Sequence, residues 1–129
     1  MAVILIIDDD HQFRKMLRKT LEHDGYEVLE ASNGLEGVNI FKEHHADLVI
    51  TDIIMPEQEG IETIAQLRKD YPTLKIIAMS GGGLIKPENY LNIAKKLFSQ
   101  RTFQKPFDRK DFLTAVRELT HEPDTCEIQ

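Results

Sequence analysis

The sequence predicts an α/β protein in which helices cover both faces of a parallel sheet. Short apolar runs rich in β-branched residues alternate five times with segments whose apolar residues recur at helical spacing. Consecutive strand–helix units connect by right-handed crossovers, so this alternation favours an open parallel sheet. Length agrees with this, because 129 residues suit one domain with one core.

Five segments are predicted as strands. Residues 3–7 form a continuous apolar run, which is typical of a central parallel strand covered on both faces. Residues 26–30 read as a shorter, more exposed strand, and residues 101–104 as a weak one. The remaining two strands are predicted at residues 47–51 and 75–79.

Helices are predicted between and after these strands. Asn33 with Glu36 resembles a capping box, Asp108 can cap the last helix, Gly25 can end the first, and Pro87 suits the first turn of the fourth. The expected apolar faces are Phe13, Met16, Leu17 and Leu21; Val38 and Phe41; Ile61, Ile64, Ala65 and Leu67; Leu91, Ala94 and Leu97; and Phe112, Leu113, Val116 and Leu119.

Composition excludes several classes of function. A net charge of −6 disfavours nonspecific binding to nucleic acid or anionic membrane, so no direct nucleic-acid partner is expected. The single cysteine, Cys126, excludes an internal disulfide framework. No apolar run approaches the length of a membrane span, and the N-terminus lacks the basic leader of a signal peptide. We therefore expect a cytoplasmic protein without membrane insertion.

Residues whose side chains can bind a metal or take part in a reaction directly follow the apolar runs. In open parallel sheets, ligands bind at the carboxyl ends of the strands. Gathered carboxylates repel one another, so a hard cation such as Mg²⁺, which prefers oxygen ligands, would stabilise them. A free carboxylate can also act as a nucleophile toward phosphorus, with a lysine and a hydroxyl to neutralise the phosphoryl oxygens. The residues at these positions are Asp8, Asp9, Asp10, Asp52, Ser80 and Lys105.

Together these motifs resemble a response-regulator receiver domain of bacterial two-component signalling. The resemblance spans residues 3–119 and implies a flavodoxin-like, doubly wound (βα)5 fold with strand order 2-1-3-4-5. It also implies a receiver domain at residues 1–120, followed by a polar tail at 121–129. Its motifs are Ile6-Ile7-Asp8-Asp9, Leu48-Val49-Ile50-Thr51-Asp52, Met55-Pro56 with Gly60, Met79-Ser80-Gly81 and Lys105-Pro106-Phe107.

The resemblance assigns roles to individual residues. Asp52 matches the phosphoacceptor, and Asp8 and Asp9 match the acidic pair that holds Mg²⁺, with the carbonyl of Ile54 completing the metal shell. Ser80 matches the hydroxyl that moves toward the phosphoryl group. Lys105 matches the lysine that pairs with it, and the Lys105–Pro106 bond is expected to be cis.

The family's activity is signalling without turnover of a substrate. The resemblance implies that a sensor histidine kinase or a histidine phosphotransfer protein donates the phosphoryl group, and that a downstream protein target binds afterwards. With only a short polar tail after the last helix, the chain is predicted to be a stand-alone receiver that relays phosphate between histidine-containing proteins or binds a target when phosphorylated. The alternative is that the sequence is a fragment of a longer protein. The fourth helix and fifth strand, with Tyr90, Lys95 and Lys96, are the expected output surface.

Three features depart from the family pattern. Thr102 occupies the position that is aromatic in many receivers, and Phe103 should point to the opposite face of a strand. Three glycines at residues 81–83 make that loop permissive, so we hypothesise that this loop and the following helix move on phosphorylation. Apolar Ile54 predicts restricted water access and slow self-hydrolysis.

Other interpretations compete with this one. A small phosphatase could use Asp8 as nucleophile and Asp10 as acid, but this leaves Asp52 unexplained. A phosphorylation-independent interaction module would keep the fold without the chemistry. We interpret Asp10 as a helix cap and the pair His44 and His45 as a solvated helix end.

Overall fold

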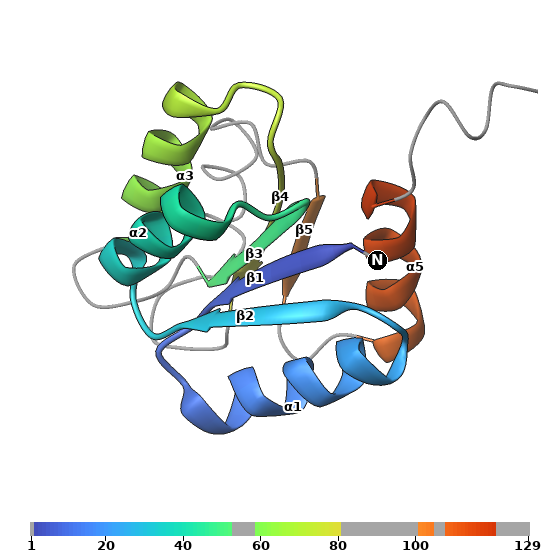
Figure 1. The fold of residues 1–129 in the computed structure, drawn as a ribbon. Coiled ribbons are helices and arrows are strands. Elements are labelled where there is room, and N and C mark those ends of the chain that lie inside the picture. Colours follow the sequence, from blue (N-terminus) through green and yellow to red (C-terminus); the bar gives the residue numbers. More distant parts are fainter. Residues whose placement is uncertain (1, 53–58, 81–100, 105–107, 121–129) are drawn as a thin grey trace, which may run out of the picture.

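The computed structural model describes residues 2–52, 59–80, 101–104 and 108–120. Its centre is a parallel sheet in the order β2-β1-β3-β4-β5 (Figure 1). The predicted α/β class with a parallel sheet is confirmed. The predicted fourth helix, around Leu91, Ala94 and Leu97, falls on residues 81–100 and lies outside the described residues.

The strands are β1 (Val3–Ile7), β2 (Glu27–Ala31), β3 (Leu48–Asp52), β4 (Lys75–Ser80) and β5 (Arg101–Gln104). Two of them match the predicted bounds, whereas β2, β3 and β4 end one residue later than predicted. Asp52 and Ser80 are therefore the last residues of their strands, still within the ladder, because Asp52 pairs with Met79 and Ser80 with Gln104.

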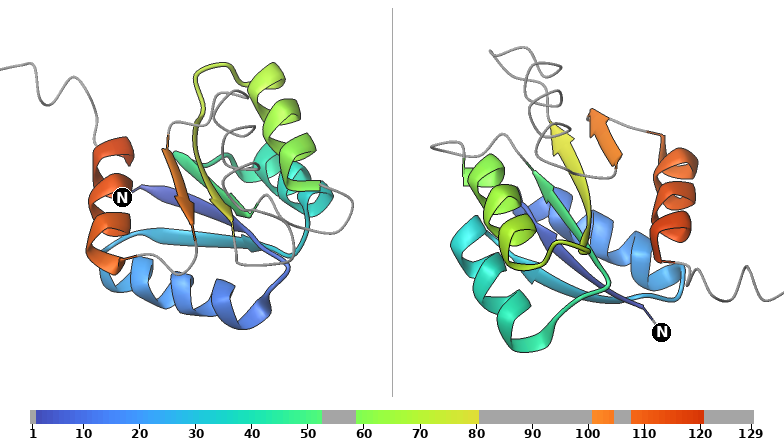
Figure 2. Two further views of the ribbon diagram at one scale, coloured as in Figure 1. Left: turned by 180° about the vertical axis from the view of Figure 1, so that it is seen from behind. Right: turned by 90° about the horizontal axis from the view of Figure 1, so that it is seen from above.

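In the part of the chain that the structure describes, helices cover both faces of the sheet (Figure 2). One face packs on α2 (Gly34–His44) and α3 (Glu59–Asp70), and the other on α1 (His11–His23) and α5 (Arg109–Thr120). Because side chains alternate along a strand, Leu5 and Ile7 of β1 enter the first core, and Ile4 and Ile6 enter the second. Both cores explain the unbroken apolar run of β1.

Hydrogen bonds at the helix ends confirm most of the predicted caps. Asn33 accepts from the amide of Glu36, but Glu36 accepts in return from the amide of Ser32, one residue before the cap. The C-cap of α1 is Asp24, and Gly25 follows it with φ of +98°. The Gly25 and Tyr26 amides donate to Glu22 and Leu21, which is the Schellman pattern that a glycine favours.

Two predicted core residues are wrong. Met16 of α1 is 48% exposed, and Ala65 of α3 is exposed. On the same two helices, the polar residues Arg14 and Thr63 are buried instead. Helical periodicity locates an apolar face to within about one position, but the neighbouring elements decide which flanking residue is covered.

Gly37 lets α2 approach β1 closely. A Cβ atom at this position would lie 2.4 Å from Cδ1 of Ile7, well inside van der Waals contact. The glycine costs some helix stability, but it lets α2 pack directly against the end of β1. Among the described residues, none of the helices is long and apolar enough to cross a membrane.

Candidate functional site

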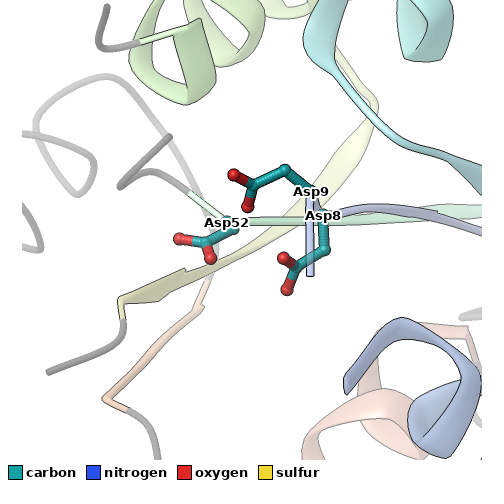
Figure 3. Close-up of side chains that lie close together, drawn as sticks. All are labelled: Asp8, Asp9 and Asp52. Atoms are coloured by element: carbon teal, nitrogen blue, oxygen red, sulfur yellow. The ribbon is translucent and has the colours of Figure 1, made fainter. Parts of the chain in front are cut away.

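Three carboxylates meet at the carboxyl ends of β1 and β3. β1 ends at Ile7, which pairs with Thr51, so Asp8 comes next to Asp52 across the ladder. Oxygens of Asp8, Asp9 and Asp52 all lie within 4.8 Å of one another. Figure 3 shows the three side chains together where the two strands end.

The cluster is only partly open to solvent. Asp8 is fully buried and Asp52 is 5% exposed, whereas Asp9 is exposed. Like charges so close repel one another, and burial strengthens that repulsion because water screens less. Helix α1 begins at His11, directly after this acidic run, and the positive end of its dipole offsets part of the charge.

The donor set fits a hard divalent cation. Carboxylate oxygens are the ligands that Mg²⁺ prefers, and an exposed Asp9 leaves room for the waters that Mg²⁺ usually keeps. Among the described residues this is the one group of three or more acids, histidines or cysteines with ligand atoms so close. His44 and His45 are exposed at the end of α2, which confirms that they form a solvated helix end.

Asp8 is fixed at several points. Its amide donates to the carbonyl of Ala31 over 3.1 Å, which continues the ladder beyond β1. Its Oδ1 accepts from the Asp10 amide at 2.9 Å, and its carbonyl accepts from Nη1 of Arg14 at 2.6 Å. The Asp8 carboxylate is therefore held in one orientation.

Asp10 has a different task from its two neighbours. Its Oδ1 accepts from the amide of Phe13 at 3.1 Å, and it is the N-cap of α1. The interpretation of Asp10 as a helix cap is confirmed.

The residue missed by the sequence analysis is Arg14. Its Nε donates to Oε1 of Glu30 at 2.8 Å, and Glu30 also accepts from Arg18 at 2.6 Å. Burial raises the pKa of Glu30, but the hydrogen bonds from Arg18 and Arg14 lower it by more, so the pKa lies below its ordinary value. A signal existed, because Arg14 lies three and seven residues before Leu17 and Leu21, on the apolar face.

Other predicted site residues are only partly covered. The backbone of Ser80 ends β4, which lies beside β3 at the same edge of the sheet. The other predicted residues lie outside the part of the chain that the structure describes: Ile54, Lys105, the cis bond before Pro106, residues 81–83, Tyr90, Lys95, Lys96 and Cys126.

Phe103 of β5 faces α5. Its ring meets that of Phe112 in an edge-on contact with centroids 5.7 Å apart, and it packs against the core shared by α1 and α5. Phe103 is thus engaged in packing within that core. Thr102 precedes it and pairs with Ala78 in the ladder.

Comparison with known proteins identifies the class. The family model for the response regulator receiver domain matches residues 4–117, and the chain belongs to that family. Response regulator receiver domains take part in two-component signalling.

Individual relatives show how the chain compares in length. It is 30% identical to sporulation initiation phosphotransferase F of Bacillus subtilis, covering 88% of this chain and 90% of the relative. It is 34% identical to the transcriptional regulator NtrC of Azospirillum brasilense over 89% of this chain, but spans only 23% of that longer protein.

A solved structure extends the likeness to three dimensions. Response regulator protein TrrA from Thermotoga maritima, solved in complex with Mg²⁺ and BeF, has a TM-score of 0.81 to this chain at 29% identity. The alignment covers 92% of this chain and 99% of TrrA.

Proposed function

We propose that this receiver domain accepts a phosphoryl group on Asp52 and changes its binding to a protein target as a result. The observation that carries the proposal is the meeting of Asp52 with Asp8 and Asp9, whose oxygens lie within 4.8 Å of one another. This places a nearly buried carboxylate beside two acids suited to a divalent cation.

The chemical step is a phosphoryl transfer. An oxygen of the Asp52 carboxylate attacks phosphorus, an O–P bond forms, and the P–N bond to the donor histidine breaks, with the electron pair leaving on the imidazole. Such a step depends on positioning and charge neutralisation more than on further covalent chemistry. Asp52, held at the end of β3, has a fixed place from which to attack.

Asp8, Asp9 and Asp52, with the carbonyl of Ile54, would hold Mg²⁺. When bound, Mg²⁺ neutralises charge that develops on the phosphoryl oxygens. The bound Mg²⁺ and BeF of TrrA support this part of the proposal by relationship. Lys105 would pair with a phosphoryl oxygen, Ser80 would donate a hydrogen bond to another, and Ile54 would limit attack by water on the acyl phosphate.

The remaining parts of the proposal rest on the family. The donor would be a sensor histidine kinase or a histidine phosphotransfer protein, and the target another protein. The receiver domain would span residues 1–120, with a helix around residues 87–97 completing five strand–helix units and a polar tail at 121–129. In this view the domain labels itself and does not turn over a substrate.

Intact mass after incubation with Mg²⁺ and acetyl phosphate tests the proposal. Wild type should gain one phosphoryl adduct, which should disappear when Mg²⁺ is chelated. Asp52→Asn removes the nucleophile with little change in shape and should give no adduct. Asp70→Asn, an exposed aspartate at the end of α3, is the matched control and should label like wild type.

Two other outcomes would contradict the proposal. An unlabelled wild type, under conditions that label another receiver, would favour a phosphorylation-independent interaction module. Sustained hydrolysis of an added phosphomonoester would favour a phosphatase.

A further inference from the structure

Arg14 lies beside the acidic cluster without being one of its ligands. The side chain is 10% exposed, and each of its three guanidinium nitrogens has a partner. Nε donates to Glu30, Nη1 to the backbone carbonyl of Asp8, and Nη2 lies 3.0 Å from Nδ1 of His11. An arginine can only donate, so Nη2 is the donor in this contact and Nδ1 of His11 the acceptor.

These contacts tie the loop before α1 to β2. The backbone amide of Arg14 donates to the carbonyl of Asp10 at 2.9 Å, while its side chain reaches the carbonyl of Asp8 at 2.6 Å. Glu30, on β2, anchors the other side of the guanidinium. One residue therefore fixes the loop that carries Asp8, Asp9 and Asp10 at both of its ends.

We infer that Arg14, anchored by Glu30, is a positioning residue: it holds the backbone carbonyl of Asp8, and so keeps that residue placed for its carboxylate to bind a divalent cation. This inference rests on the proposed function, since it concerns the same acidic site. Partners behind metal ligands commonly change metal affinity by 10–100-fold when removed, because the ligands lose their fixed orientation. The fork of a guanidinium suits this role, since it binds two groups at once in a rigid geometry.

The direction in which Mg²⁺ affinity changes distinguishes a positioning role of Arg14 from an effect of its charge. Removing a positive charge near three carboxylates would by itself strengthen the binding of a cation. If Arg14 positions the site, Arg14→Gln should weaken Mg²⁺ binding in spite of that change in charge. We expect the Kd for Mg²⁺ to rise about 10-fold.

Arg18 provides a matched control. It lies one helical turn further along α1 and also donates to Glu30, at 2.6 Å, but its other hydrogen bond goes to Glu22 rather than to Asp8, and its side chain is 45% exposed. Arg18→Gln removes the same charge and one of the hydrogen bonds to Glu30. It should leave the Kd for Mg²⁺ within about twofold of the wild-type value, because an exposed charge is well screened.

The experiment is a titration with MgCl₂, followed by amide chemical shifts in two-dimensional NMR spectra of the full chain. The same spectra report whether each variant is folded. Arg14→Lys is the second variant, because it keeps the charge but loses the fork, and it should also bind Mg²⁺ several-fold more weakly than wild type. It decides the question if Arg14→Gln does not fold.

The possible results distinguish the two proposals. Weaker Mg²⁺ binding by folded Arg14 variants, with Arg18→Gln near wild type, supports the positioning role. Wild-type affinity in the Arg14 variants, or an equal loss in Arg18→Gln, overturns that role while leaving the proposed function standing. A wild-type chain that shows no response to Mg²⁺ overturns both.

Discussion

The two ends of the sheet are built on opposite principles. At the amino ends of the strands, groups satisfy one another: Asp47 accepts from the amide of Val3 at 2.8 Å and donates its own amide to the Val3 carbonyl at 2.7 Å. Phe41 and Tyr71 pack edge to face with centroids 4.6 Å apart. At the carboxyl ends, three carboxylates lie within 4.8 Å of one another.

This difference separates stability from chemistry. Aromatic packing and paired polar groups lower the free energy of the folded state, whereas clustered like charges raise it. Parallel strands make the division natural, because every helix that follows a strand directs its positive end toward the carboxyl edge. An acidic site is tolerated there and would be costly at the other edge.

The largest expected effect on stability comes from disrupting the packing at the amino ends of the strands. Phe41 is 3% exposed, so Phe41→Ala should lower the free energy of unfolding by about 3–4 kcal/mol, through lost burial and a cavity. Urea unfolding with and without Mg²⁺ measures this. The added stability from Mg²⁺ should be the same in the variant and in wild type, and a lost Mg²⁺ effect would show that the two ends are not independent.

A smaller change in the free energy of unfolding, of opposite sign, is expected for a substitution at the carboxyl ends of the strands. Asp9→Asn removes an exposed charge within 4.8 Å of two others, and should raise the free energy of unfolding without divalent cations by about 1 kcal/mol. Stabilisation by Mg²⁺ should shrink at the same time. The control is Glu62→Gln, an exposed acid on α3, which should change neither quantity. A less stable Asp9→Asn protein would contradict mutual repulsion.

The smallest effect concerns the network behind the acidic site and depends on pH. The pKa of Glu30 is lowered in the folded protein from its ordinary value of 4.5. Its contribution is therefore fully present above about pH 4.5 and is lost as pH falls through the folded-state pKa. We expect wild type to exceed Glu30→Gln in free energy of unfolding by less than about 1 kcal/mol at pH 6. The gap should close toward pH 3, and a gap that widens there would refute the sign.

Sequence reasoning reached the acidic site because it depends on strand ends. The apolar run of β1 stops at Ile7 and that of β3 stops near Asp52, and parallel strands bring such ends to one edge. Placing Asp8 beside Asp52 needed only those two facts and the adjacency of the strands. Both predicted bounds of β3 differ from the structure by one residue: Asp47 precedes the strand, whereas Asp52, also polar, remains within the ladder opposite Met79.

Helical periodicity predicted less of the structure than the strand ends did. It predicted that α1 has an apolar face, but not that Met16 would lie outside that face and Arg14 inside it. Burying a guanidinium is favourable only where every donor finds an acceptor, and those acceptors come from β2 and from the turn after β1.

The sequence by itself thus determined the class of fold, the strands of the sheet and the edge at which the acids gather. Those features follow from local runs of apolar residues and from the geometry of parallel strands. Only the tertiary structure decided which acid is buried, how Asp8 is oriented and what Arg14 does. These depend on contacts between residues far apart along the chain, which no local pattern encodes.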